Sequence, residues 1–421
     1  MDQAGKVGAV LRNARVNATT SWILLGWVGV IAGGSVLEGD LLWAGFATMI
    51  VAVAVVPPLA FRQGTVMPPW EVLLLATLPL TGRAFNIGGS TELLLSHLSI
   101  AALALIIAVE LHVFTAVRMT DWFAVSFVVV TTLATAGLWA VVQWLSDGVF
   151  GTLFIPDLRT LMIHFTGATV AGVGSGVLFT LYFRRITELY RRCCPGFRPQ
   201  HTTVESARPR VRLRDRIGIS EQRERQFVRL LQVLLIGVFF VGLARGNLSI
   251  IVNSVLALVV TQLPSILERD YQLSMDPGLV LWITTAVSVH AIGALGPYQA
   301  IWWWDNLAHA LSSSVVAAIG YTTMRAISEH TADVWIPPRV VFVFILLFVV
   351  AAGVFWEVLE FLAGRLAAAL AIEGVLIQYG LRDTMLDLVF DIIGGLIVAV
   401  WGTAYLTGSV EELTAWLGDG R

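Results

Sequence analysis

The sequence is poor in charged residues and almost free of lysine and cysteine. Only 13% of its 421 residues are Asp, Glu, Lys or Arg, whereas 57% are apolar. The charged share is about half of that in ordinary soluble domains. This composition excludes a soluble multi-domain enzyme and a disordered regulator. The two cysteines, Cys193 and Cys194, are adjacent, which excludes a framework of disulfides.

Long apolar segments dominate the sequence instead. A helix of about 20 apolar residues crosses the hydrocarbon core of a bilayer with all its backbone groups hydrogen-bonded. The sequence therefore predicts an all-α, polytopic integral membrane protein with about 12 transmembrane helices. The segments lie at residues 21–37, 41–61, 69–87, 92–117, 122–145, 161–183, 228–245, 248–266, 278–297, 306–326, 339–363 and 385–407.

A polar segment from Arg184 to Gln226 separates the first six apolar segments from the last six. It contains twelve arginines and five acidic residues, and basic loops stay on the cytoplasmic side of a membrane. We therefore predict a multi-pass protein of the cell membrane, with the N-terminus, this linker and the C-terminus in the cytoplasm. The predicted domains are a first six-helix repeat at 1–183, a basic linker at 184–227 and a second six-helix repeat at 228–421.

The two groups of six segments resemble each other. Gly-Asp-Leu at 39–41 opens the second segment and Gly-Asn-Leu at 246–248 opens the eighth. Met-Pro-Pro at 67–69 and Met-Asp-Pro at 275–277 precede the third and the ninth. The alignment then pairs Arg83 with His290, His97 with His309, Trp139 with Trp356, His164 with Asp387 and Ala168 with Asp391. Tandem repeats of six spans have the same orientation, as in parallel-repeat transporters.

Charged residues inside the apolar segments gather in the second half. Asp305 and His309 open the tenth span, four residues apart. Glu357 and Glu360 close the eleventh, and Asp383, Asp387 and Asp391 open the twelfth. Each spacing places its members on one helix face, and the predicted orientation places all three clusters at the outer side of the membrane. Because charge inside a membrane is costly and usually functional, we expect one shared site.

Six carboxylates cannot all ionise side by side, because like charges repel and burial penalises charge. A bound cation resolves the conflict, and oxygen ligands with one imidazole suit Zn, Mn, Fe or Mg. The predicted metal ligands are Asp305, His309, Glu357, Asp387 and Asp391, and the predicted catalytic residues are Glu360 and Asp383. Protonated carboxyls are the alternative. They would serve proton coupling or hydrogen bonds between membrane helices.

The order of these residues resembles the VanZ-like and YjdF-type families of membrane proteins. Their pattern has Asp-x-x-x-His opening one span, a Glu-bearing end to the next, and an Arg/Asp-rich turn before Asp-x-x-x-Asn/Asp-x-x-Gly. Here it comprises residues 305–309, 356–360 and 382–394, within a region of resemblance at 305–402. VanZ-like proteins are linked to glycopeptide-antibiotic resistance. The resemblance implies a shared site and carries no activity with it.

Three classes of function remain open at this point. The leading hypothesis is a divalent-metal-dependent enzyme that acts on a lipid or lipid-linked substrate through an outer-leaflet site. A proton- or cation-coupled transporter is the main alternative. The third class is a non-catalytic membrane protein that binds a lipid, a drug or a partner. Membrane lipids are the expected partners, and no nucleic-acid recognition motif is visible. The sequence does not indicate the oligomeric state.

Overall fold

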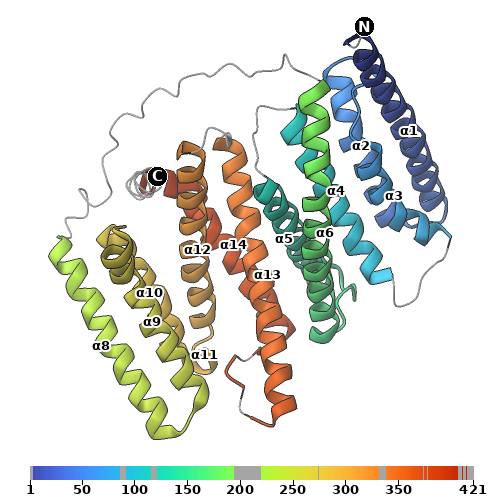
Figure 1. The fold of residues 1–421 in the computed structure, drawn as a ribbon. Helices are drawn as coiled ribbons and strands as arrows, with labels where there is room; N and C mark the ends of the chain where they lie inside the picture. Colours follow the sequence, from blue (N-terminus) through green and yellow to red (C-terminus); the bar gives the residue numbers. More distant parts are fainter. Residues whose placement is uncertain are drawn as a thin grey trace. The chain divides into compact units, whose positions relative to one another are not determined.

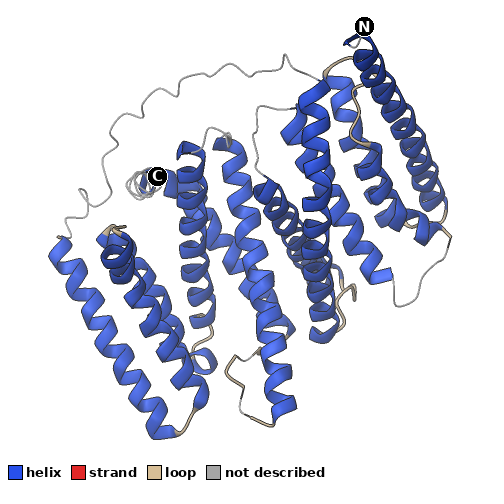
Figure 2. Ribbon diagram, in the orientation of Figure 1, coloured by secondary structure: helices blue, strands red, loops and turns tan. Residues whose placement is uncertain are grey.

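The structure is a computed structural model that describes residues 3–85, 92–114, 121–193, 220–330 and 338–405, except 274, 373 and 377, together with 410 and 414. All the regular structure among these residues is helical (Figure 2). The helices are α1 (Gln3–Leu37), α2 (Leu41–Ala60), α3 (Trp70–Ala84), α4 (Glu92–Phe114), α5 (Asp121–Phe150), α6 (Leu158–Cys193), α8 (Glu221–Arg245), α9 (Leu248–Tyr271), α10 (Pro277–Gly293), α11 (Pro297–Ala300), α12 (Trp304–His330), α13 (Pro338–Leu370) and α14 (Leu381–Tyr405).

Turn residues set where the helices begin and end. Gly246 has a positive φ of 61° and ends α8, and its amide donates to the Leu243 carbonyl. This is a left-handed C-cap that glycine adopts without strain. Asn247 then caps α9, because its side chain accepts from the amide of Ile250 at 2.8 Å. Asp276 caps α10 in the same way and precedes Pro277 at the first helical position.

The helices divide between two compact units, which are described separately. Unit 1 contains α1 to α4, α5 up to Ala136 and α6 from Thr166. In it α1 packs on α2 and on α3, and α3 packs on α4 (Figure 1). A further contact joins α1 to the start of α3, where Asn17 accepts from the amide of Trp70 at 2.9 Å and donates to the Pro68 carbonyl at 3.2 Å.

Unit 2 contains the rest of α5 and α6 and all helices from α8 onward. Here α8 packs on α9 and on α10, and α12 packs on α10, α13 and α14. One buried cluster between α8, α9 and α10 consists of Leu235, Ala257 and Ala291. The contact between α12 and α14 is the most extensive of the unit, and these two helices carry most of the candidate site.

Each of the twelve predicted spans coincides with one of these helices, with α11 as an additional short turn. The prediction of an all-helical membrane protein is therefore confirmed. Among the described residues, six helical segments are long and apolar enough to cross a membrane, and the count of twelve spans stays a prediction. The six are Arg15–Leu37, Trp43–Ala60, Trp122–Phe150, Gln222–Arg245, Leu248–Tyr271 and Val340–Leu370, and His97–Ala108 and Pro277–Gly293 are shorter apolar helices.

Candidate metal centre

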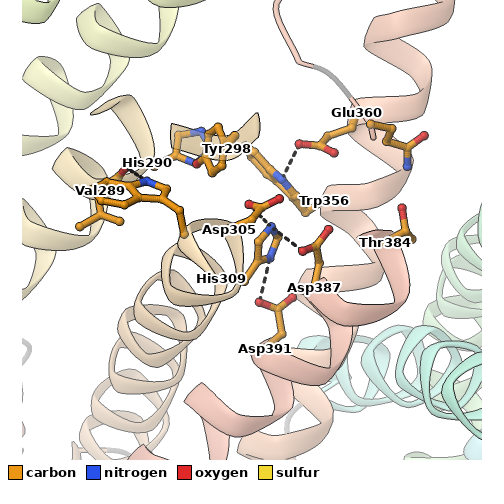
Figure 3. A network of polar contacts seen from close by, with 12 residues as sticks. Val289, His290, Tyr298, Asp305, His309, Trp356, Glu360, Thr384, Asp387 and Asp391 are labelled. Atoms are coloured by element: carbon orange, nitrogen blue, oxygen red, sulfur yellow. Dashed lines mark hydrogen bonds and ion pairs between the residues drawn. The ribbon is translucent and has the colours of Figure 1, made fainter. Parts of the chain in front are cut away.

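The site is organised around His309, one turn into α12. Its Nδ1 lies 3.3 Å from Oδ1 of Asp391, and its Nε2 lies 3.6 Å from Oδ1 of Asp387 and 3.8 Å from Oδ1 of Asp305. Figure 3 shows the three carboxylates converging on the imidazole from α12 and α14. The spacing of four residues explains this convergence, because Asp305 and His309 share one face of α12 while Asp387 and Asp391 share one face of α14.

Three ligand atoms that could hold a metal ion gather on the Nε2 side of the imidazole. One ligand atom each from Asp305, His309 and Asp387 lies within 4.8 Å of the other two. Two ligands about 2.1 Å from a common ion lie about 3.0–4.2 Å apart, depending on the angle between them. The two measured distances from Nε2, 3.6 and 3.8 Å, fall in that range.

Asp387 is the residue whose environment most needs an additional partner. Only 5% of its surface is exposed, and its Oδ1 has no hydrogen-bond partner among the described residues. A buried carboxylate oxygen without a partner is strongly unfavourable. A histidine that ligates a metal ion is neutral. With Asp305, Asp387 and Asp391 all ionised and His309 neutral, the four side chains would carry three negative charges, of which a divalent cation would neutralise two.

Glu357 is buried and hydrogen-bonded away from His309. It exposes 1% of its surface, and its Oε2 accepts from Gln378 Nε2 at 2.8 Å and from the Thr384 hydroxyl at 2.9 Å. Gln378 lies in the connection between α13 and α14, and Thr384 lies in the first turn of α14. The two bonds fix this connection to α13 and so hold the start of α14, from which Asp387 projects.

The two predicted catalytic carboxylates lie at the edge of the cluster. Glu360 accepts from the indole Nε1 of Trp356 at 3.0 Å, one turn earlier on α13. Asp383 lies in the first turn of α14 and accepts from the backbone amide of Tyr379. Both residues are partly exposed, so they retain access to an incoming molecule.

An aromatic group borders the cluster on the side of α10. The hydroxyl of Tyr298 lies 2.7 Å from Nδ1 of His290, and the rings of His290 and Trp356 meet edge to face with centroids 6.3 Å apart. The indole of Trp304 donates to the Val289 carbonyl at 3.1 Å, which ties the start of α12 to α10. Burial raises the pKa of Tyr298, and the nearby Asp305 carboxylate adds to this shift, so the phenol stays neutral at pH 7.

Two glycines provide the space that the cluster needs. A Cβ at Gly353 of α13 would overlap Oδ2 of Asp391, and a Cβ at Gly394 of α14 would overlap the Ala310 carbonyl and the Ser313 hydroxyl of α12. Gly394 therefore allows α12 and α14 to approach closely, and Gly353 leaves room for the carboxylate that holds His309. Small residues commonly serve close helix contacts in membrane proteins.

The structure brings four of the predicted site residues together around His309, counting the histidine itself, and holds Glu357, Glu360 and Asp383 in separate hydrogen bonds beside it. Sequence reasoning missed Gln378 and Tyr298. Gln378 lies in an irregular connection without helical periodicity, and Tyr298 lies in the four-residue helix α11. Neither position carries a spacing signal that connects it to the acidic residues.

Comparisons with known proteins agree with the membrane assignment. Residues 227–408, which hold the whole site, match the family described as "Predicted membrane protein (DUF2238)". Residues 5–67 match a "Domain of unknown function (DUF8268)". An "Uncharacterized protein" of Thermotoga maritima is 29% identical over 133 residues, 31% of this chain and 65% of that protein, so the alignment spans less than two thirds of the relative. No solved structure matches the chain.

The protein is therefore a multi-pass membrane protein whose second half matches a family of predicted membrane proteins. Neither family description states an activity, so the chemistry has to be argued from the geometry around His309. The finer resemblance to VanZ-like and YjdF-type proteins stays a prediction.

Proposed function

We propose that the protein is a divalent-metal-dependent membrane enzyme that acts on a lipid or lipid-linked substrate. In this proposal Asp305, His309 and Asp387 hold the ion. The ligand set is narrower than the sequence predicts, because Asp391 contacts the opposite nitrogen of His309 and Glu357 contacts Gln378 and Thr384. Zn, Mn, Fe and Mg all accept such ligands.

The observation that carries the proposal is the position of Asp391. A metal-bound histidine almost always donates its other ring N–H to a carboxylate or carbonyl, which orients the ring and strengthens it as a ligand. Asp391 is placed to accept from Nδ1, and Nε2 is thereby left as the ligand nitrogen that faces Asp305 and Asp387. Carboxyls that served only to pack helices together would not need one carboxylate at Nδ1 and two others at Nε2.

The remaining carboxylates support an enzyme. An ion bound by three protein ligands has open positions, at which it can polarise a phosphoryl or carbonyl oxygen or activate water. Glu360 and Asp383 lie next to the ligand set and are partly exposed, so either can serve as the general base. Trp356 orients Glu360, and the Tyr379 amide orients Asp383.

The proposal is tested by elemental analysis of the detergent-purified full-length protein beside Asp387→Asn. The asparagine keeps the shape of the side chain and removes its charge, and Glu268→Gln on the exposed end of α9 is the matched control. We expect about one equivalent of metal in the wild type and the control and almost none in Asp387→Asn. A site with three protein ligands no longer binds the ion tightly when one of the three is removed. Wild-type protein that binds no Zn, Mn, Fe or Mg in a direct titration would refute the proposal.

We further propose that the membrane topology places the N-terminus, the linker at 184–227 and the C-terminus in the cytoplasm, with twelve spans in two repeats. Equivalent turns support the repeat: Gly39 and Gly246 both have a positive φ, and Asp40 and Asn247 both cap the helix that follows. Cysteine labelling from outside intact cells tests the orientation. In a background in which Cys193 and Cys194 are replaced by serine, label on a cysteine placed at the exposed Ala300 and none on one placed at Arg210 is the expected pattern.

A proton- or cation-coupled transporter is the second candidate, and one observation favours it. Buried polar side chains continue along α12 beyond His309, where Ser313 and Ser314 expose 5% and 4% of their surface. Ser314 accepts from the indole of Trp282 at 3.1 Å. Proton- or cation-driven uptake by reconstituted liposomes that is lost in Asp387→Asn, without turnover of any lipid, would favour the transporter over the enzyme.

A further inference from the structure

A pocket of about 240 Å³ lies where the α8–α9 turn, the end of α10 with α11, and the end of the α13–α14 connection meet. It is half open, and its polar lining consists of Arg245, Asn247, Tyr298, Gln299 and Tyr379, with the backbone around Gly296. Pockets for drug-sized molecules measure about 300–1,000 Å³. This pocket therefore has the size of a small headgroup and not of an acyl chain.

The lining of the pocket favours an anion. Arg245 is the one ionised side chain among the lining residues, none of which is acidic. Among the described residues, its guanidinium makes one long contact, 3.5 Å from Nη1 to the Leu295 carbonyl, which leaves most of its five N–H donors for a ligand. The side chain of Gln299 adds donors, and the α9 N-terminus contributes its positive dipole end. The last carbonyls of α8 already accept hydrogen bonds from the backbone amides of Gly246 and Asn247.

Two residues connect this pocket to the candidate metal centre. Tyr298 lines the pocket and bonds to His290, whose ring contacts Trp356 beside Glu360 (Figure 3). Tyr379 also lines the pocket, and its amide donates to Asp383. Its neighbour Gln378 donates to Glu357. The pocket is thus linked through Tyr298 and Tyr379 to the residues that contact Glu360 and Asp383.

We propose that this pocket binds the phosphate of a phosphate ester and so positions the substrate of the adjoining metal centre. The role in substrate positioning rests on the proposed function, whereas phosphate binding by Arg245 stands on the pocket alone. Arg245 would pair with two phosphate oxygens, which its planar fork favours. Tyr379 and Gln299 would donate to the remaining oxygens. Both lipid headgroups and soluble phosphate esters carry this chemistry.

The test measures binding to the purified full-length protein by calorimetry, with dihexanoyl phosphatidic acid, its uncharged counterpart dihexanoylglycerol, and inorganic phosphate as probes. Arg245→Gln should weaken phosphatidic acid binding at least about tenfold, since it removes charge-assisted hydrogen bonds. Tyr379→Phe removes one hydroxyl and should weaken it less. Arg365→Gln is the matched control, because Arg365 is exposed on α13 and does not line the pocket.

Equal affinity of wild type and Arg245→Gln for phosphatidic acid would overturn the proposal, as would preferential binding of dihexanoylglycerol. If inorganic phosphate competes at concentrations similar to those of phosphatidic acid, the ligand is a soluble phosphate ester. A strong preference for phosphatidic acid assigns the pocket to a lipid headgroup. Metal content is measured on the same samples, so that a failed pocket with retained metal is distinguished from a failed metal centre.

Discussion

The turns that open α2 and α9 have the same backbone and opposite charge. Each has a glycine of positive φ, at 39 and 246, followed by a capping residue. In unit 1 the turn carries Glu38 and Asp40, and Asp40 pairs with Arg83 at 2.6 Å. The guanidinium of Arg83 also lies 4.9 Å from the ring centroid of Trp43. In unit 2 the aligned residues are Arg245, Asn247 and His290.

This difference separates what builds the turn from what gives it a function. Both turns keep the glycine and the cap, which the helix ends require. The charges are free to change, and in unit 1 they satisfy each other in an ion pair. In unit 2 the turn carries no carboxylate, and its arginine lines a pocket. We expect the same contrast at the candidate metal centre, where the predicted alignment places Ala136 and Ala171 of the first half opposite Gly353 and Gly394.

The largest effect is expected from Gly394→Ala. This change gives α14 the alanine that the alignment pairs with Gly394 in the first half. The added Cβ would overlap the Ala310 carbonyl, and a backbone atom of a packed helix cannot move aside easily. Overpacking of this kind costs about 1–3 kcal/mol or more, so the thermal midpoint should fall well below that of the wild type. Gly364→Ala on α13, where a Cβ meets nothing within 4 Å, should be neutral. Equal midpoints for both variants would contradict the close α12–α14 contact.

The second test, Gly353→Ala, should damage the metal centre more than the fold. Its Cβ would overlap Oδ2 of Asp391, a side-chain atom that can rotate away. The displaced carboxylate would then no longer hold His309. Loss of such an outer contact weakens metal binding by about 10- to 100-fold, which a competition titration with a chelator of known affinity measures. Unchanged metal affinity with a displaced Asp391 would argue against its orienting role.

The sequence predicted the positions of the helices well, because a helix that crosses a bilayer must contain a long apolar segment. It was less accurate at helix ends, as α6 continues to Cys193 although the apolar run stops near residue 183. A helix continues into a polar region without any apolar signal. The i, i+4 spacing predicted that Asp387 and Asp391 share a face, and they meet His309 there.

The helical spacing could not predict the hydrogen-bond partners of Glu357. Its partners Gln378 and Thr384 follow an irregular connection, and only the folded chain brings that connection back to α13. The pocket was equally hidden, because Arg245, Tyr298 and Tyr379 come from three separate turns. A site made of loop residues has no period from which it can be predicted.

A smaller effect is expected from separating the ion pair of unit 1. Both partners are partly exposed, at 36% and 27% of their side chains, and pairs of that exposure contribute about 0–1 kcal/mol. Arg83→Gln, Asp40→Asn and the double variant form a thermodynamic cycle in which Asn preserves the helix cap. We expect a coupling free energy below about 1 kcal/mol in denaturant unfolding. A coupling of several times that value would show that the pair is part of the core of unit 1.

The smallest effect on stability is expected from the reverse exchange, Asn247→Asp, which gives the second turn the capping residue of the first. Asp and Asn cap helices about equally, so the thermal midpoint should not change. The new carboxylate would pair with Arg245 and repel an anion in the pocket, so binding of phosphatidic acid should weaken while metal content stays the same. Asn247→Ser keeps a cap without adding charge and should retain binding. If Asn247→Asp binds phosphatidic acid as tightly as the wild type, charge at this turn does not select the ligand, and the difference between the two turns is structural alone.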